Sequence, residues 1–175
     1  LFRSDGNDTL ANVENVIGSA WADTLTGDNN PNNLGGYDGD DSLVGGGGDD
    51  SLFGDAGENT LVGGAGNDLL VGGADIDDWV DYSSAPAGVT VNLHGESASD
   101  GQGGTDTIKG VEKAIGSAFD DTLTGTTANN QLQGGLGNDS LDGFNGDDKL
   151  IGGAGNDTLN GGVGVKDVAE YDSSA

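Results

Sequence analysis

Leucine recurs at every ninth position along most of the chain. From Gly18 the sequence divides into seven nine-residue units that end at Val80, and a second run of six units extends from Gly116 to Ala169. Positions 1 to 6 of each unit are rich in glycine, aspartate and asparagine, which favour turns. Positions 7 to 9 mostly read x-Leu-x, the alternation of a short strand. The pattern predicts three-residue strands separated by six-residue turns.

The apolar residues at position 8 are the expected core. Strands this short become stable when they stack at about 4.8 Å and share backbone hydrogen bonds. Two turns and two strands, eighteen residues, then form one coil of an all-β fold, a right-handed parallel β-roll with two facing internal ladders. The predicted ladder residues are Leu25, Leu34, Leu43, Leu52, Leu61, Leu70, Trp79, Leu123, Leu132, Leu141, Leu150, Leu159 and Val168.

The charge and composition of the chain bear on whether it folds and on which partners it can bind. The 175 residues include 31 acidic and 5 basic ones, a net charge of −26, and only 33% are hydrophobic. Such a composition is also typical of disorder, because burial cannot offset chain entropy. The unbroken register of thirteen units argues against disorder as the final state, but disorder remains the expected state without a ligand. The acidic excess favours cations as partners and leaves no basic patch for nucleic acid.

The repeats resemble the RTX family of hemolysin-type calcium-binding proteins, whose motif is GGxGxDxUx with U a large apolar residue. The best matches are Gly45–Phe53, Gly63–Val71, Gly134–Asp142 and Gly152–Asn160. The segment between the two runs also looks like a connector common in that family. The resemblance implies a calcium-loaded β-roll that is exported unfolded through a type I secretion channel and folds outside the cell or at its surface.

The resemblance also implies where the ions bind. Each Ca²⁺ would lie between stacked turns, held by position 6 carboxylates and by backbone carbonyls near positions 1 to 4, as suits a hard cation. Residues eighteen apart would share an ion, which predicts about five to seven ions. The candidate ligands are Asp23, Gly36, Asp38, Asp41, Gly45, Gly46, Gly48, Asp50, Asn59, Gly63, Gly64, Gly66, Asp68, Asp77, Asp121, Gly134, Gly135, Gly137, Asp139, Gly143, Asp148, Gly152, Gly153, Gly155 and Asp157.

Several turns depart from the motif. Asn32, Asn59 and Asn130 offer a neutral oxygen at position 6, so weaker sites are expected there. Lys166 places an ammonium group at position 6 of the last unit. It either abolishes that site or replaces the ion with its own charge beside Asp148.

The domain organisation follows from an internal duplication. The predicted segments are an N-terminal cap or connector at 1–17, the first array at 18–80, a connector at 81–115, the second array at 116–169 and the start of another connector at 170–175. Val89, Val91 and Leu93 alternate as a strand expected to cap the first roll. Ile108, Val111 and Ile115 are expected to cap the second. We interpret the chain as part of a longer polypeptide.

Other classes of function are disfavoured by the residue inventory. There is no cysteine, and a single histidine, His94, is expected at the surface, so no catalytic triad or zinc site is predicted and the chain is interpreted as a non-enzyme. No apolar run approaches the roughly 18 residues of a membrane span.

Position 9 of the first array forms an apolar series, Val44, Phe53, Val62, Val71 and Val80. This series predicts an outward stripe that contacts the connector, a neighbouring module or another chain. Three functions therefore remain open: a calcium-dependent folding module of a secreted protein, a building block of an adhesin, stalk or surface layer, and an accessory domain of a secreted polysaccharide-modifying enzyme or lipase.

Overall fold

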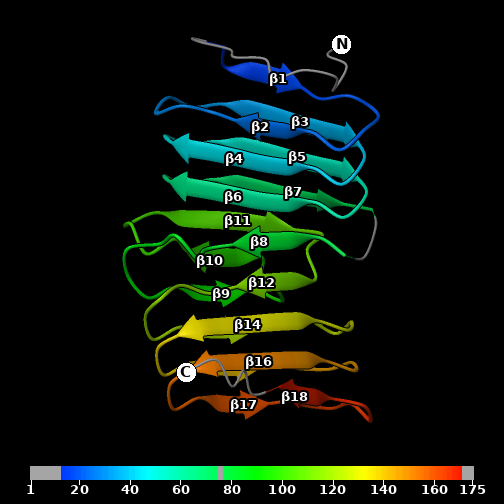
Figure 1. Ribbon diagram of the computed structural model, residues 1–175, viewed down its shortest axis with the longest axis vertical. Coiled ribbons are helices and arrows are strands. Elements are labelled where there is room, and N and C mark those ends of the chain that lie inside the picture. The colour runs from blue at the N-terminus through cyan, green and yellow to red at the C-terminus, as the bar shows by residue number, and fades with distance from the viewer. Residues whose placement is uncertain (1–12, 75–76, 171–175) are drawn as a thin grey trace.

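The computed structural model describes residues 13–74 and 77–170, and this part of the chain contains strands and no helix. The strands form two sheets that face each other along one elongated stack (Figure 1). Residues 1–12 of the predicted N-terminal cap and 171–175 of the last connector lie outside the described residues. Within the described residues, no helix has the length and hydropathy to cross a membrane.

The first sheet contains ten strands in the spatial order β1-β3-β5-β7-β11-β10-β9-β13-β15-β17. Their bounds are β1 Asn15–Ile17, β3 Asn33–Asp38, β5 Ser51–Ala56, β7 Leu69–Gly73, β9 Thr90–Asn92, β10 Ser97–Ser99, β11 Thr105–Lys109, β13 Thr122–Thr124, β15 Ser140–Asp142 and β17 Thr158–Asn160. The second sheet contains eight, in the order β18-β16-β14-β12-β8-β6-β4-β2. Their bounds are β2 Thr24–Thr26, β4 Ser42–Gly47, β6 Thr60–Ala65, β8 Trp79–Asp81, β12 Lys113–Ile115, β14 Gln131–Leu136, β16 Lys149–Ala154 and β18 Val168–Glu170.

The predicted coil of eighteen residues is confirmed. Leu34 lies opposite Leu52 in one sheet, and Leu43 lies opposite Leu61 in the other, both in parallel pairs. Alternate side chains of each strand point between the sheets, so position 8 residues of successive units form the two internal ladders. The position 8 leucines from Leu34 to Leu70 are fully buried, whereas Leu25 and Leu159 near the two ends of the stack are partly buried.

Several strands are longer than the predicted three residues. β4 and β6 continue past position 9 through the next glycines, where Gly46 pairs with Gly64. Identical glycine-rich turns stacked on each other can extend the backbone ladder, because no side chain keeps the two chains apart.

The last unit of each array carries one extra residue, so two predicted core positions are wrong. Leu61 lies opposite Val80, which is fully buried, and Trp79 is only half-buried. Likewise Leu150 lies opposite Ala169 rather than Val168. The nine-residue count assigned position 8 of these two units one residue too early in the chain. A shift by one residue exchanges the inward and outward faces of a strand.

The connector does not cap the arrays as predicted; it continues the sheets. β9, which contains Val91, pairs with β13 of the second array, and β11, which contains Ile108, pairs with β7 of the first. The assignments of Val91 and Ile108 were therefore reversed, whereas Ile115, in β12, lies beside β14 of the second array as predicted. β10 joins β9 and β11 by antiparallel pairing, and β12 pairs with both β8 and β14. The two arrays consequently form one solenoid (Figure 1).

The predicted apolar stripe is divided between the two sheets. Val44 lies opposite Val62, and Phe53 lies opposite Val71, in different sheets, because successive units contribute to opposite sides of the coil. These four side chains are half-buried, and Val80 belongs to the core. Among the described residues of the first array, these side chains therefore do not form a single apolar face.

Candidate metal sites in the glycine turns

Side chains at position 6 form a ladder at each edge of the stack. The backbone N–H of one position 6 residue donates to Oδ1 of the residue one coil further on. Examples are Asp23 to Asp41 at 2.8 Å, Asp50 to Asp68 at 2.8 Å, Asp121 to Asp139 at 2.9 Å and Asp139 to Asp157 at 3.0 Å. The predicted stacking of aspartates eighteen residues apart is thus confirmed. Oδ1 of each accepting carboxylate is occupied by a hydrogen bond from the backbone of the adjacent coil.

The second carboxylate oxygen is buried without a hydrogen-bond partner in much of this ladder. Within the described part of the chain this holds for Oδ2 of Asp41, Asp50, Asp68, Asp139 and Asp148, all residues that are at most 3% exposed. A buried carboxylate oxygen without compensation is strongly unfavourable. Burial, reinforced by neighbouring carboxylates, raises the pKa of Asp41, Asp50 and Asp139 to about 6 despite the stabilising N–H bond.

Position 1 glycine leaves the space beside this oxygen free of side chains. A Cβ added to Gly45 would collide with Oδ2 of Asp50 and with the carbonyl oxygen of Gly63, one coil away. The equivalent Cβ on Gly134 would meet Oδ2 of Asp139 and the carbonyl oxygen of Gly152. Two oxygens from successive coils therefore face the same point, and only glycine permits that approach.

Position 2 divides the turns into two kinds. In closed turns its backbone N–H bonds to the position 6 side chain, as from Ser19 to Asp23 at 2.6 Å or from Thr126 to Asn130 at 2.6 Å. In open turns position 2 has positive φ, as at Gly46, and the second oxygen of Asp50 is left unpartnered. Closed turns are the first two of each array, whose position 2 residues are Ser19, Asp28, Ser117 and Thr126.

The predicted candidates fall into these classes. Asp23 and Asp121 lie in the ladder but in closed turns, where serine donates to them. Asn59 lies in the ladder, accepts from the Asp41 N–H at 3.0 Å and donates to the Gly57 carbonyl. Asp38, at position 3, is exposed and outside the ladder.

The remaining candidates belong to open turns. Aspartates of the ladder are Asp41, Asp50, Asp68, Asp139, Asp148 and the half-exposed Asp157. The glycines that face them from position 1 are Gly36, Gly45, Gly63, Gly134, Gly143 and Gly152. The glycines with positive φ at positions 2 and 4 are Gly46, Gly48, Gly64, Gly66, Gly135, Gly137, Gly153 and Gly155.

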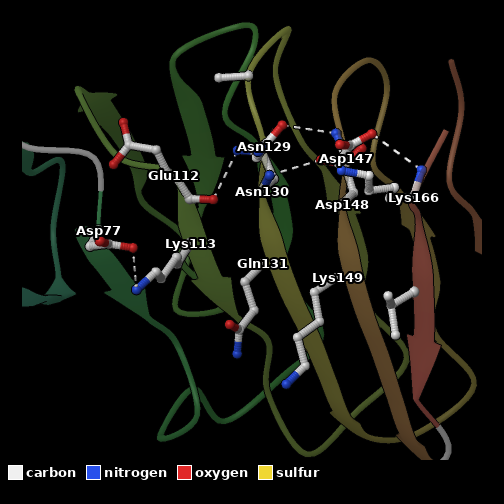
Figure 2. Close-up of a pocket in the computed structure, with 12 residues that line it drawn as sticks. Asp77, Glu112, Lys113, Asn129, Asn130, Gln131, Asp147, Asp148, Lys149 and Lys166 are labelled. Carbon is white, nitrogen blue, oxygen red and sulfur yellow. Dashed lines mark hydrogen bonds and ion pairs between the residues drawn. The ribbon is translucent and has the colours of Figure 1, made fainter. Parts of the chain in front are cut away.

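The extra residue in each terminal unit also corrects two position 6 predictions. Asp78, not Asp77, accepts the Asn59 N–H at 2.9 Å and is fully buried. Asp77 is exposed and forms an ion pair with Lys113 at 2.8 Å (Figure 2). In the last unit Asp167, not Lys166, accepts the Asp148 N–H at 3.1 Å. Both roles considered for Lys166 depended on the wrong register.

A second, more exposed ladder at position 5 was missed by the sequence reasoning. Side-chain oxygens of Asp49, Asp120 and Asn129 accept the N–H of the position 5 residue one coil on, at 2.7 to 2.8 Å. Figure 2 shows this contact from Asn129 to Asp147. The Asn-Asp and Asp-Asp pairs that recur before position 7 were the available signal.

The connector contributes two further acidic residues that sequence reasoning did not select. Asp106 occupies a position 6 place, because its Oδ1 accepts the Asp68 N–H at 3.0 Å, while its Oδ2 accepts the Tyr82 hydroxyl at 2.8 Å. Asp100 is 1% exposed and has a buried, unpartnered Oδ2. The stretch from Gly101 to Lys109, GQGGTDTIK, follows the nonapeptide pattern closely enough to have indicated Asp106.

The donor set of the open turns suits a hard cation. Among the described residues, no three His, Cys, Asp or Glu side chains come close enough together to hold a metal on their own. A cation here would therefore combine one or two carboxylates with backbone carbonyls, an all-oxygen set of the kind that Ca²⁺ takes. Softer metals prefer the thiolate or imidazole ligands that these turns lack.

Comparison with known proteins agrees with this chemistry. No curated protein sequence matches the chain significantly. The family model described as RTX calcium-binding nonapeptide repeat matches residues 17–52, 35–70, 44–78, 115–143 and 142–165, which together cover more than half of the chain. With its parallel β-solenoid and its stacked glycine turns, the chain belongs to the family of RTX calcium-binding repeat proteins.

Proposed function

We propose that this chain is a calcium-dependent folding module, whose role is structural and which takes one Ca²⁺ between successive coils at each open turn whose aspartate Oδ2 is buried and unpartnered. The observation that carries the proposal is the set of buried, unpartnered Oδ2 atoms in the open turns. The ligands would be that oxygen and the carbonyl oxygen of the position 1 glycine one coil on, as for Asp50 with Gly63. The bound ion would supply positive charge between stacked carboxylates.

Calcium would then provide a large part of the folding free energy. Two carboxylates about 5 Å apart repel by about 3 kcal/mol at an effective dielectric constant near 20, and a divalent ion between them reverses the sign. The 36 glycines add a high cost in chain entropy on folding. Binding free energy and folding free energy are therefore coupled.

The distribution of open turns bears on the number of ions. Five open-turn aspartates have an unpartnered buried oxygen, which supports the lower end of the expected five to seven ions. The closed turns of Asp23, Asn32, Asp121 and Asn130 already satisfy the position 6 oxygen with a local N–H. They would form the ion-free start of each array.

The cellular role follows from the calcium concentration that such a module requires. Extracellular modules bind Ca²⁺ with dissociation constants of about 10⁻⁴ to 10⁻³ M, so this chain would stay unfolded in a calcium-poor cytoplasm. We infer that it is part of a larger secreted or surface protein, exported through a type I channel and folded outside. The family membership supports this inference.

The alternative role as an assembling building block has less support. It was favoured by the module duplication and by a single apolar stripe, but the side chains of that stripe are divided between opposite sheets. An enzyme accessory role has no supporting feature among the described side chains: the aromatic residues Trp21, Tyr37 and Phe119 are exposed in separate turns.

Circular dichroism tests the proposal. In EDTA the far-ultraviolet spectrum should be that of an unfolded chain, and a β spectrum should develop as Ca²⁺ is raised towards 10⁻³ M. Mg²⁺ at the same concentration is the control and should induce far less, since it demands near-ideal octahedral geometry. The same β spectrum in EDTA and in calcium would overturn the proposal.

A further inference from the structure

The junction between the arrays contains a buried carboxylate that no repeat motif accounts for. Asp100 lies in the connector loop after β10 and is 1% exposed. Its Oδ1 accepts three backbone N–H groups, from Gln102, Gly103 and Gly104, at 2.8 to 2.9 Å. These bonds fix the orientation of the side chain. Its Oδ2 has no hydrogen-bond partner in the described chain.

The connector loop places this unpartnered oxygen beside the open turn from Gly63 to Asp68 of the first array. A Cβ added to Gly104 would lie 2.8 Å from Oδ2 of Asp100 and would collide with the carbonyl oxygen of Gly66. Gly104 therefore stacks directly on Gly66, with the Asp100 oxygen beside that contact. Thr105 and Asp106 continue the stacking on Asn67 and Asp68, with N–H···O distances of 3.1 and 3.0 Å.

The turn from Gly63 to Asp68 has no complete glycine turn stacked on it. After β8 the chain passes through β9 and β10 before Gly104 stacks on Gly66, and Gly101, at position 1 of the GQGGTDTIK stretch, lies against the Ala87 carbonyl oxygen. The atoms nearest to a Cβ added on Gly63 all belong to Asp68, with its Oδ2 first. Asp106, which occupies the next position 6, has its Oδ2 occupied by the Tyr82 hydroxyl.

Asp100 and Asp68 thus form a pair of buried carboxylates, each with one unpartnered oxygen. Burial raises the pKa of Asp68, and the negative charge of Asp100 raises it further by a smaller amount. Lys113 of β12 is shared between Glu58 and Asp77, and within the described residues neither Asp68 nor Asp100 forms an ion pair with a cationic side chain. The pair therefore lacks a positive charge from the protein, and a divalent cation is the ligand that would compensate it.

We propose that Asp100 completes a calcium site at the junction, in which its Oδ2 joins Oδ2 of Asp68 and the Gly66 carbonyl and replaces the missing stacked turn. This inference rests on the proposed function, since it assumes that open turns take Ca²⁺. The site differs from the repeat sites because one carboxylate comes from outside the nonapeptide motif. Its ion would link the first array to the connector and, through β9, to the second array.

Counting bound ions in single and double variants tests the shared site. Native mass spectrometry of the full chain in calcium gives the count. Asp100→Asn, whose amide oxygen can still accept the three N–H bonds, should bind one ion fewer than the wild type, and so should Asp68→Asn. The double variant Asp68→Asn/Asp100→Asn should lose only that same ion. Asp50→Asn/Asp100→Asn, the matched control, should lose two.

The results separate the two proposals. An unchanged ion count in Asp100→Asn, with one ion lost in Asp50→Asn, overturns the junction site and leaves the proposed function intact. Two ions lost in Asp68→Asn/Asp100→Asn would show independent sites and would also overturn it. A wild-type chain that binds no calcium overturns the proposed function itself.

An anomalous difference map covers the case in which a variant fails to fold. Wild-type crystals containing Tb³⁺ in place of Ca²⁺ should show a peak within about 2.3–2.6 Å of Oδ2 of Asp100. Peaks in the turns of Asp50 and Asp139 with none beside Asp100 would overturn the junction site. No peak in any turn would contradict the proposed function instead.

Discussion

At the scale of single residues, the two kinds of turn differ in one backbone angle. Closed turns satisfy the position 6 oxygen with the position 2 N–H, whereas open turns have positive φ at position 2 and leave that oxygen to an external ligand. Glycine adopts this conformation at no steric cost. Tyr37, Asp55 and Phe144 adopt it without being glycine, with φ of 86°, 68° and 74°. The stacked turns therefore impose the conformation on them.

Tyr37→Gly should stabilise the calcium-loaded protein. Tyr37 is 55% exposed, so the ring contributes little packing, and removing the left-handed strain should raise the free energy of unfolding by about 1 kcal/mol. Urea unfolding at saturating calcium measures this. Ser42→Gly, in strand β4 and outside the left-handed region, is the control and should lower stability by about 0.5–1 kcal/mol. Equal destabilisation by both would contradict the strain.

The neighbouring pair Asp77 and Asp78 tests the register directly. Asp78→Asn replaces the fully buried carboxylate that accepts the Asn59 N–H and should lower the free energy of unfolding in calcium by about 1–3 kcal/mol. Asp77→Asn removes an exposed ion pair with Lys113 and should change it by less than about 1 kcal/mol. The reverse order would restore the register predicted from the nine-residue count.

At the scale of elements, the sequence predicted the repeating parts well and the irregular parts poorly. The period of nine with leucine at position 8 specified strands, coil length and ladder, because a single geometry serves every unit. It failed at Trp79 and Val168, where one inserted residue shifts the strand face. It also failed for the connector, since the alternation of Val89, Val91 and Leu93 predicts a strand but does not specify its partner.

The candidate site was predictable to the same extent. Aspartates such as Asp50 and Asp139 followed from the motif, since charge there is phased with glycine. The difference between open and closed turns did not follow, because it depends on backbone angles and on hydrogen bonds from Ser19 or Thr126. Asp100 was not predictable, since its place beside Gly66 depends on how the connector folds back.

Ile108→Ala tests the path of the connector. Ile108 is 1% exposed and lies opposite Leu70 in the first array, so truncation should cost about 2–5 kcal/mol. Hydrogen exchange in calcium should accelerate at β7 and β11 before it changes at β13. Val91→Ala, opposite Leu123, is the matched variant and should affect β13 first. Early loss of protection at β13 in Ile108→Ala would support the original capping assignment.

At the scale of the whole molecule, a charge of −26 on two facing sheets makes folding depend on counter-charge. In the described part of the chain the ion pairs do not supply it, because Lys113 and Lys149 bind exposed acidic residues rather than the buried ladder. Protons and divalent cations are the remaining sources.

The calcium-free chain should therefore fold better in mild acid. Burial raises the pKa of Asp41, Asp50 and Asp139 to about 6, above the unfolded value of 3.8, so their ionisation opposes folding. That penalty is fully present above pH 6 and disappears as the pH falls towards 4. In calcium-free buffer the β signal in circular dichroism should be larger at pH 5 than at pH 7.5.

A variant separates these three groups from the general loss of charge. Replacing Asp41, Asp50 and Asp139 by asparagine removes the titrating groups, so its β signal should change much less between the two pH values. A calcium-free wild type with equal or weaker β signal at pH 5 would contradict the role of the buried carboxylates.

Small-angle X-ray scattering with and without calcium tests the central claim most directly, because it reports the size of the whole chain. In EDTA we predict a radius of gyration near 40 Å, about that of an unfolded chain of this length. In millimolar calcium it should fall to about 20 Å or less, the value for a compact rod. The same compact particle in both buffers would show that the stacked carboxylates fold without the ion and would contradict the account.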